Sequence, residues 1–274
     1  MSRLRRSLEA EPADMARALV PLGLLGAGAL FHDIRGVVLL LIATGTVIAI
    51  RRDAPVRWAW AAALPIALSL TWGLFAPPAL AIDGSDCANP LSPVATWRAL
   101  EAFVVLGVLT TVAIALKATA SSLSLRWPAR WVVRLAVIGF LLAGPVALLV
   151  GPILARPFFG DVGYDVTILG AVAPALLFAV SNGVMEEVAY RGALLGWTAR
   201  VVGVWPAVIG QAVVFGLAHS GPDVAGSPIP LMVIMGIGGL VAGAITVRTR
   251  SLLLPIAIHI GLDIPIFYAL ACGS

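Results

Sequence analysis

Long apolar stretches separated by short polar segments are the feature that most restricts the fold of this chain. Most of them reach the length of about 17–25 residues that crosses the hydrocarbon core of a bilayer as a helix. In lipid only helices and closed barrels satisfy their own backbone hydrogen bonds, and continuous apolar runs of this length are typical of helices. We therefore predict an all-α, polytopic transmembrane helix bundle with about 8–9 spanning helices. The apolar stretches are residues 15–31, 36–50, 57–81, 97–117, 132–154, 166–200, 204–219, 229–247 and 251–270.

The composition agrees with a membrane protein and excludes the main soluble classes. Hydrophobic residues make up 60% of the chain and charged residues 12%, whereas soluble chains have about 45–50% and about 25%. A chain with so few charges cannot cover a water-facing surface, which excludes soluble enzymes and disordered scaffolds. The net charge of +4 is spread between the apolar stretches. We therefore expect the lipid bilayer as a partner and no nucleic acid.

The basic residues predict how the chain is oriented. With nine passes and a cytoplasmic N-terminus, 14 of the 18 Lys and Arg residues fall in cytoplasmic loops, in accordance with the positive-inside rule. Only Arg35, Arg98 and Arg156 fall outside, while Arg191 lies within a span. We therefore expect a multi-pass protein of the inner (plasma) membrane with an uncleaved first span. The Arg-, Ala-, Gly- and Val-rich composition is typical of a bacterium with a high-GC genome.

The two cysteines are too few and too distant in sequence for a zinc finger or a disulfide framework. In the predicted orientation Cys87 and Cys272 both lie on the outer side of the membrane. Disulfides persist in an oxidising periplasm. A disulfide between these two residues is therefore a hypothesis that the sequence allows.

Ionisable residues within an apolar stretch indicate either a buried pair or a functional site. A charge near the bilayer centre costs about 2.5–3.5 kcal/mol on insertion scales. Glu187 and Arg191 are four residues apart on one helical face and can neutralise each other. This pair could also serve only to hold helices together. Glu186 projects about 100° away around the helix and has no such local partner, so its carboxylate is free to face a site.

Two histidines occur in later stretches at a comparable depth. Glu186 lies 14 residues from Arg200, and His219 lies 14 residues from Trp205, about 21 Å at the helical rise. His259 lies nine residues from Arg250, about 13–14 Å. His259 and Asp263 are four apart and share a face. Taken singly, His219 can be an interfacial residue, and His259 with Asp263 a hydrogen-bonded pair or part of a proton relay. Together these groups favour water activation by general acid–base chemistry.

The motifs in these stretches resemble those of the CPBP family of intramembrane proteases, which includes CAAX prenyl endopeptidases and bacteriocin-processing enzymes. The EExxxR motif of the family is met by residues 186–191, and its FxxxH motif by residues 215–219. Its final HxxxN-type motif is met by residues 259–263, although Asp263 stands where members often carry Asn. An ionised Asp is a poor oxyanion donor, so this residue could instead orient the histidine or bind a metal.

The resemblance covers about residues 166–270, where we predict a CPBP-like protease domain. Residues 1–160 show no resemblance, and we expect transmembrane helices of unassigned role there. The resemblance implies an intramembrane endopeptidase that hydrolyses a peptide bond of a membrane-associated protein or peptide, in or near the bilayer. Glu186 with His219 would activate water, and His259, with the acidic residue that follows it, would stabilise the tetrahedral intermediate. The neighbouring Glu–Arg pair would hold the site together.

Two alternatives stay open at this point. The sequence lacks an HExxH helix, which favours a metal-free, glutamate-type enzyme, but Glu186, His219 and His259 could hold zinc and leave a position open for water. A non-proteolytic protein, either a proton-relay transporter or a bacteriocin-immunity protein, could use the same buried residues. Transporters often show related halves, and the chain has no internal repeat, so the enzyme is favoured.

Overall fold

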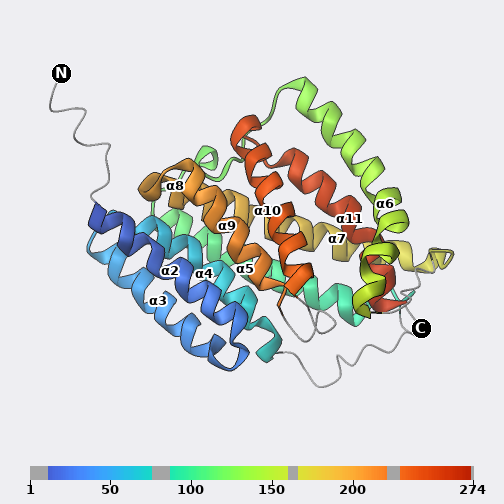
Figure 1. Ribbon diagram of the computed structural model, residues 1–274, viewed down its shortest axis with the longest axis horizontal. Coiled ribbons are helices and arrows are strands. Elements are labelled where there is room, and N and C mark those ends of the chain that lie inside the picture. The colour runs from blue at the N-terminus through green and yellow to red at the C-terminus, as the bar shows by residue number, and fades with distance from the viewer. Residues whose placement is uncertain (1–11, 76–86, 160–165, 221–228, 273–274) are drawn as a thin grey trace.

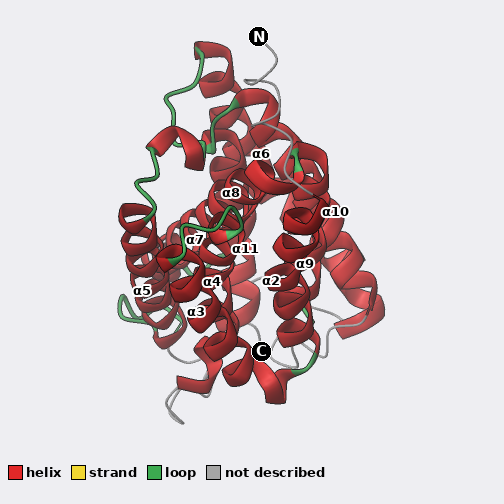
Figure 2. Ribbon diagram, turned by 90° about the vertical axis from the view of Figure 1, so that its left-hand side faces the viewer, coloured by secondary structure: helices red, strands yellow, loops and turns green. Residues whose placement is uncertain are grey.

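The computed structural model describes residues 12–75, 87–159, 166–220 and 229–272, and in these ranges the chain is helical and contains no strand (Figure 2). Eight helices in this part are long and apolar enough to cross a membrane. This confirms the predicted all-α transmembrane bundle. A further apolar helix, α9, is shorter and accounts for the remaining predicted stretch. The end of the predicted 57–81 stretch lies outside the described residues.

The helices follow the predicted apolar stretches closely, including the tight hairpin between the first two. Their bounds are α2 (Pro12–Leu30), α3 (Arg35–Arg51), α4 (Arg57–Thr71), α5 (Pro93–Ala115), α6 (Arg130–Phe159), α7 (Val172–Glu186), a π-helical segment (Glu187–Leu195), α8 (Gly196–Val202), α9 (Val204–Ala218), α10 (Ile229–Thr249) and α11 (Leu253–Ala271).

The α7 helix and its π-helical continuation lie in the middle of the bundle. The α7 helix packs against α5 and α11, and the π segment packs against α4, α8 and α9. In Figure 1, α2 and α3 lie at one edge of the bundle and α6 at the opposite edge. One buried cluster contains Ile66 and Leu109 from the N-terminal half together with Leu194 and Trp197. The N-terminal helices therefore form part of the wall around the C-terminal motifs.

Loops that carry basic residues meet at one end of the bundle. The guanidinium of Arg200 lies 4.0 Å from the centroid of the Trp58 ring, and the Trp197 indole donates a hydrogen bond to the Ser122 hydroxyl at 3.1 Å. The connections α3–α4, α5–α6 and α8–α9 therefore lie together. This is the end that we propose faces the cytoplasm.

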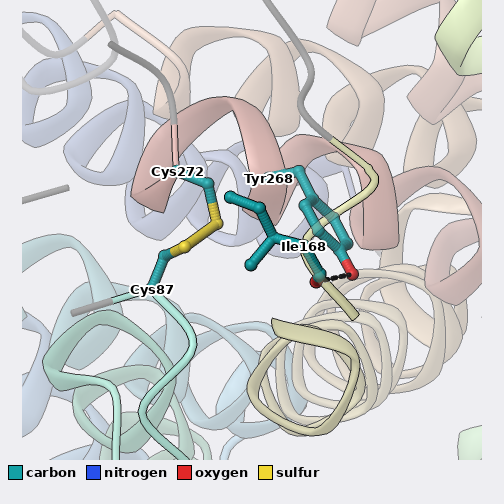
Figure 3. The surroundings of a disulfide bond; sticks show 4 residues. All are labelled: Cys87, Ile168, Tyr268 and Cys272. Carbon is teal, nitrogen blue, oxygen red and sulfur yellow. Dashed lines mark hydrogen bonds between the residues drawn. A yellow bond between two sulfur atoms is a disulfide. The ribbon is translucent and has the colours of Figure 1, made fainter. Parts of the chain in front are cut away.

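A disulfide between Cys87 and Cys272 closes the bundle at the other end of α5 and α11 (Figure 3). The pairing that the sequence allowed is thus confirmed, with the two Cα atoms 5.2 Å apart. Beside it, the hydroxyl of Tyr268 donates a hydrogen bond to the carbonyl of Ile168 at 3.3 Å. Since Cys87 precedes α5, and Ile168 precedes α7, these contacts fix the starts of both helices against the end of α11.

We expect loss of this disulfide to lower the thermal stability of the protein. The bond links residues 185 positions apart, and disulfides that close long loops typically contribute about 2–4 kcal/mol. Thermal unfolding in detergent, with and without reductant, measures the effect on the wild type and on a Cys87→Ser/Cys272→Ser variant. The variant should have a lower melting temperature than the wild type, and reductant should not change it. A wild type whose melting temperature is unchanged after full reduction and alkylation would contradict this expectation.

Candidate active site

The EExxxR motif lies where α7 widens into a π-helix. The overlong 166–200 stretch contains Pro174, a residue that can bend a helix. Pro174 lies instead in the first turn of α7, where a proline interrupts no helical hydrogen bond. The irregularity falls at Glu187–Leu195, and all nine residues of this segment are buried. Such widened turns are frequent at functional sites.

Glu187 and Arg191 form the predicted ion pair. Nη1 of Arg191 lies 3.0 Å from Oε1 of Glu187, and both side chains are almost fully buried. The same oxygen lies 2.9 Å from Nδ1 of His259, and because a carboxylate only accepts, this nitrogen donates. The guanidinium also lies 4.0 Å from the centroid of the Phe215 ring. The pair therefore ties the π segment to α9 and α11.

His259 lies between three carboxylates. Its Nδ1 is held by Glu187, and its Nε2 lies 3.7 Å from Oε2 of Glu186 and 3.6 Å from Oδ2 of Asp263. The side chains of Glu186 and His259 each keep 15% exposure, whereas that of Asp263 keeps 6%. Oε2 of Glu186 accepts no hydrogen bond from the described residues. The uncommitted Oε2 is itself buried, while the Glu186 side chain as a whole keeps partial exposure.

Asp263 has a partner that the sequence did not reveal. The Asn182 amide donates a hydrogen bond from Nδ2 to Oδ2 of Asp263 at 2.8 Å, across from α7 to α11. Asn182 lies four residues before Glu186 on the same face of α7. An amide one turn before the motif in an apolar run is the signal that could have found it. The amide that related motifs often carry at position 263 is here on the facing helix.

His219 lies beside the hydrogen-bonded group of Glu187, His259, Asp263 and Asn182 and is not hydrogen-bonded to it. Its Nδ1 lies 2.8 Å from the Phe215 carbonyl, which only accepts, so Nδ1 carries a proton and Nε2 is left with a lone pair. The ring contacts Phe215 edge-on, with centroids 4.8 Å apart. The structure thus joins the other five predicted residues by direct contacts and holds His219 next to them through Phe215.

These three motifs fall inside a recognisable family segment. Residues 168–264 match the family model of Rce1-like type II CAAX prenyl endopeptidases. Over this segment the chain is similar to that family, and we call residues 168–264 the Rce1-like domain. The match confirms the resemblance to CPBP proteases that the motifs indicated. The chain matches no curated protein and no solved structure.

A charged pair from outside the Rce1-like domain adjoins its motifs. The sequence placed Arg98 in an outer loop, but α5 begins five residues before it, with a proline in its first turn, where this residue is favoured. Nη1 of Arg98 lies 2.6 Å from Oε2 of Glu101, and the Ser69 hydroxyl donates to Oε1 of Glu101 at 2.6 Å. The Arg98 guanidinium lies 5.9 Å from the centroid of the Phe178 ring on α7.

Glu186, His219 and His259, the zinc ligands considered from the sequence, stay a prediction for the Rce1-like domain. Within the described ranges, no three His, Cys, Asp or Glu residues are grouped so that they could hold a metal ion. A zinc site needs its ligands at about 2.0–2.2 Å from the ion. The residues support acid–base chemistry by their own side chains.

Proposed function

We propose that this chain is an intramembrane endopeptidase that hydrolyses a peptide bond of a membrane-associated protein or peptide, with water activated by Glu186 and His219. One observation carries the proposal. Glu186 is a partly exposed carboxylate with an uncommitted oxygen, and it faces Nε2 of a histidine whose other ring nitrogen is fixed by a buried ion pair. The Rce1-like segment supports peptide hydrolysis as the reaction class.

In the first step Glu186 acts as general base. Its free oxygen accepts a proton from the attacking water, and a positioned carboxylate of this kind contributes about 10²–10⁴-fold to the rate. His219 offers the lone pair of Nε2, because its Nδ1–H is committed to the Phe215 carbonyl. This lone pair accepts a second hydrogen bond from the same water. The nucleophile is thereby oriented as well as deprotonated.

In the second step His259 stabilises the tetrahedral intermediate. With Nδ1–H held by Glu187, a proton on Nε2 can be donated to the developing oxyanion. Asp263, fixed by the Asn182 amide, lies 3.6 Å from Nε2 and supports the positive charge of the ring. Asp263 therefore orients the histidine, and the proton taken by Glu186 passes to the leaving amine.

The proposal places the catalytic groups in residues 166–270 and gives the helices of residues 1–160 a supporting role. It also places the protein in the plasma membrane of a bacterium, with a cytoplasmic N-terminus. The convergence of basic loops around Trp58 and Arg200 supports this orientation.

Cleavage of a library of membrane-anchored reporter peptides by the purified protein tests the proposal. We expect His219→Ala to lower kcat by about 10²-fold or more. His32→Ala, a change of the histidine between α2 and α3, is the matched control and should leave kcat unchanged. Each protein is assayed with and without a chelator. Cleavage that survives the chelator supports the glutamate-type mechanism, while loss that zinc restores makes the enzyme a metalloprotease.

A wild type that is folded but cleaves no reporter would count against the proposal. In that case the transporter and immunity-protein interpretations of the buried residues regain weight. The protein is then placed in vesicles together with a light-driven proton pump, and the proton gradient is measured on illumination. A gradient that the protein dissipates favours the transporter, and an unchanged gradient favours the immunity protein.

A further inference from the structure

Two stretches of the chain without acidic residues supply a group of basic side chains at one end of α5, α6, α10 and α11. No Asp or Glu occurs in residues 102–160 or in residues 224–262. At the end that we propose faces the cytoplasm, these stretches hold Lys117, Arg126, Arg130, Arg134, Arg248 and Arg250. All six residues are exposed, and their side chains form no ion pair or hydrogen bond within the described part of the chain. Positive charge without an internal counter-charge favours an anionic partner.

The α5–α6 and α10–α11 connections meet and bring basic residues of both together (Figure 1). The backbone N–H of Leu252 donates a hydrogen bond to the carbonyl of Ser124 at 3.2 Å. Arg250 and Arg126 each lie two residues from this bond. The first turn of α6 also packs against the last turns of α10 and the start of α11. We call the four arginines at this junction the basic cluster, which consists of Arg126, Arg130, Arg248 and Arg250.

Exposed tryptophans lie beside these arginines at the start of α6. Trp127 is 85% exposed and Trp131 is 55% exposed, and each directly follows an arginine. Tryptophan is typical of the membrane–water interface, where its ring lies at the level of the headgroups. Arg130 and Arg134 are one helical turn apart, and like charges at this spacing repel each other. A phosphate group at the same depth would offset this repulsion and accept hydrogen bonds from the guanidinium groups.

The α5–α6 connection also lies directly against the π segment and the start of α8. A Cβ on Gly196 would lie 2.5 Å from the carbonyl oxygen of Ser122, and a Cβ on Gly192 would lie 3.1 Å from that of Leu123. Because glycine has no Cβ, the two backbones can approach this closely. A ligand that holds the α5–α6 connection in place therefore also supports the segment that contains the buried Glu–Arg pair.

We propose that the basic cluster binds the phosphate headgroup of an anionic phospholipid in the surrounding bilayer. The guanidinium fork matches the oxygens of a phosphate, and the adjoining tryptophans lie at the level where headgroups lie. A zwitterionic lipid carries a cation of its own, which the uncompensated arginines repel, so the site selects lipids with a net negative charge. The bound headgroup holds the α5–α6 and α10–α11 connections together. This site is separate from the proposed catalytic residues, and the inference does not depend on the proposed function.

Native mass spectrometry of the full chain in detergent, with phosphatidylglycerol or phosphatidylcholine added, measures binding. We expect the wild type to bind phosphatidylglycerol about 10-fold or more tightly than phosphatidylcholine, as for charge-assisted hydrogen bonds to a phosphate. The variant Arg126→Gln/Arg130→Gln should lose most of this preference. Arg51→Gln/Arg52→Gln is the matched control, because it removes two exposed arginines from the end of α3. The control should keep the preference.

Thermal unfolding in lipid nanodiscs measures the structural consequence. A ligand that binds only the folded state raises the melting temperature. The wild type should melt about 3–6 °C higher in discs that contain phosphatidylglycerol than in discs of phosphatidylcholine alone. Arg126→Gln/Arg130→Gln should melt at the same temperature in both. Inorganic phosphate added to the phosphatidylcholine discs should leave the melting temperature of the wild type unchanged.

Four results would overturn the inference. Equal affinity of the wild type for the two lipids would exclude a site for the anionic headgroup. Equal losses in the two double variants would show that the overall surface charge, and not the basic cluster, attracts the lipid. An equal melting temperature of the wild type in both discs would show that the connections do not depend on a bound headgroup. Stabilisation by inorganic phosphate as strong as that by the lipid would make the ligand a free anion. None of these measurements requires cleavage, so their failure leaves the proposed function untouched.

Discussion

Replacing Glu186 with glutamine is expected to lower kcat/KM for reporter cleavage by about 10³-fold or more while the protein stays folded. Glutamine has the same shape but cannot take a proton from water, and a general base contributes about 10²–10⁴-fold. Oε2 of Glu186 accepts no hydrogen bond within the described part of the chain. The amide therefore breaks no hydrogen bond of that oxygen. Reporter kinetics measure the loss, and thermal unfolding in detergent checks the fold.

Glu187→Gln, one residue further along, is the matched comparison for this change. It removes the partner of a buried arginine, so we expect a clear fall in stability, which Glu186→Gln should not show. The two variants thus separate loss of chemistry from loss of structure. A Glu186→Gln protein that keeps more than about a tenth of the wild-type activity would be incompatible with a general base at this position.

Local patterns in the sequence were sufficient to predict the helices and most of the site. A spanning helix has to satisfy its own backbone, so the length of an apolar run determines the element without reference to its neighbours. The spacing between Glu187 and Arg191 likewise predicts their contact, and this contact survives the widening of the helix at Glu187–Leu195. The widening itself depends on how other helices pack around this buried segment. Residue spacing within one helix carries no information about that packing.

Residues that depend on contacts between distant helices were missed. Asn182 gains its importance from Asp263 on α11, and Glu101 is tied to Ser69 on α4. Arg98 was assigned to the outer side because it is the second residue of the predicted 97–117 stretch. The available signal was the spacing of Arg98 and Glu101, three residues apart in a helix that starts with a proline. This spacing predicts an ion pair within the helix. The partners across helices could be found only in three dimensions.

Replacing Arg191 with methionine is expected to destabilise the protein by about 3–5 kcal/mol, because it leaves Glu187 buried without its cation. Both side chains of the pair are almost fully buried, so water cannot compensate the carboxylate. Arg57→Met is the matched control. Its ion pair with Asp53 has the same four-residue spacing, but the Asp53 side chain is 86% exposed, and exposed pairs contribute about 0–1 kcal/mol. Unfolding in detergent by heat or denaturant measures both variants, and equal losses would show that burial does not control the effect.

The double variant Glu187→Gln/Arg191→Met separates the two functions of the pair. No uncompensated charge remains in it, so most of the stability lost in Arg191→Met should return. Activity should stay low, because Nδ1 of His259 would no longer face the carboxylate that now lies 2.9 Å away and sets its tautomer and orientation. Recovery of both stability and cleavage would mean that the pair only holds helices together. Recovery of stability alone would mean that the buried ion pair does not stabilise this bundle and that the function of Glu187 is to orient the histidine.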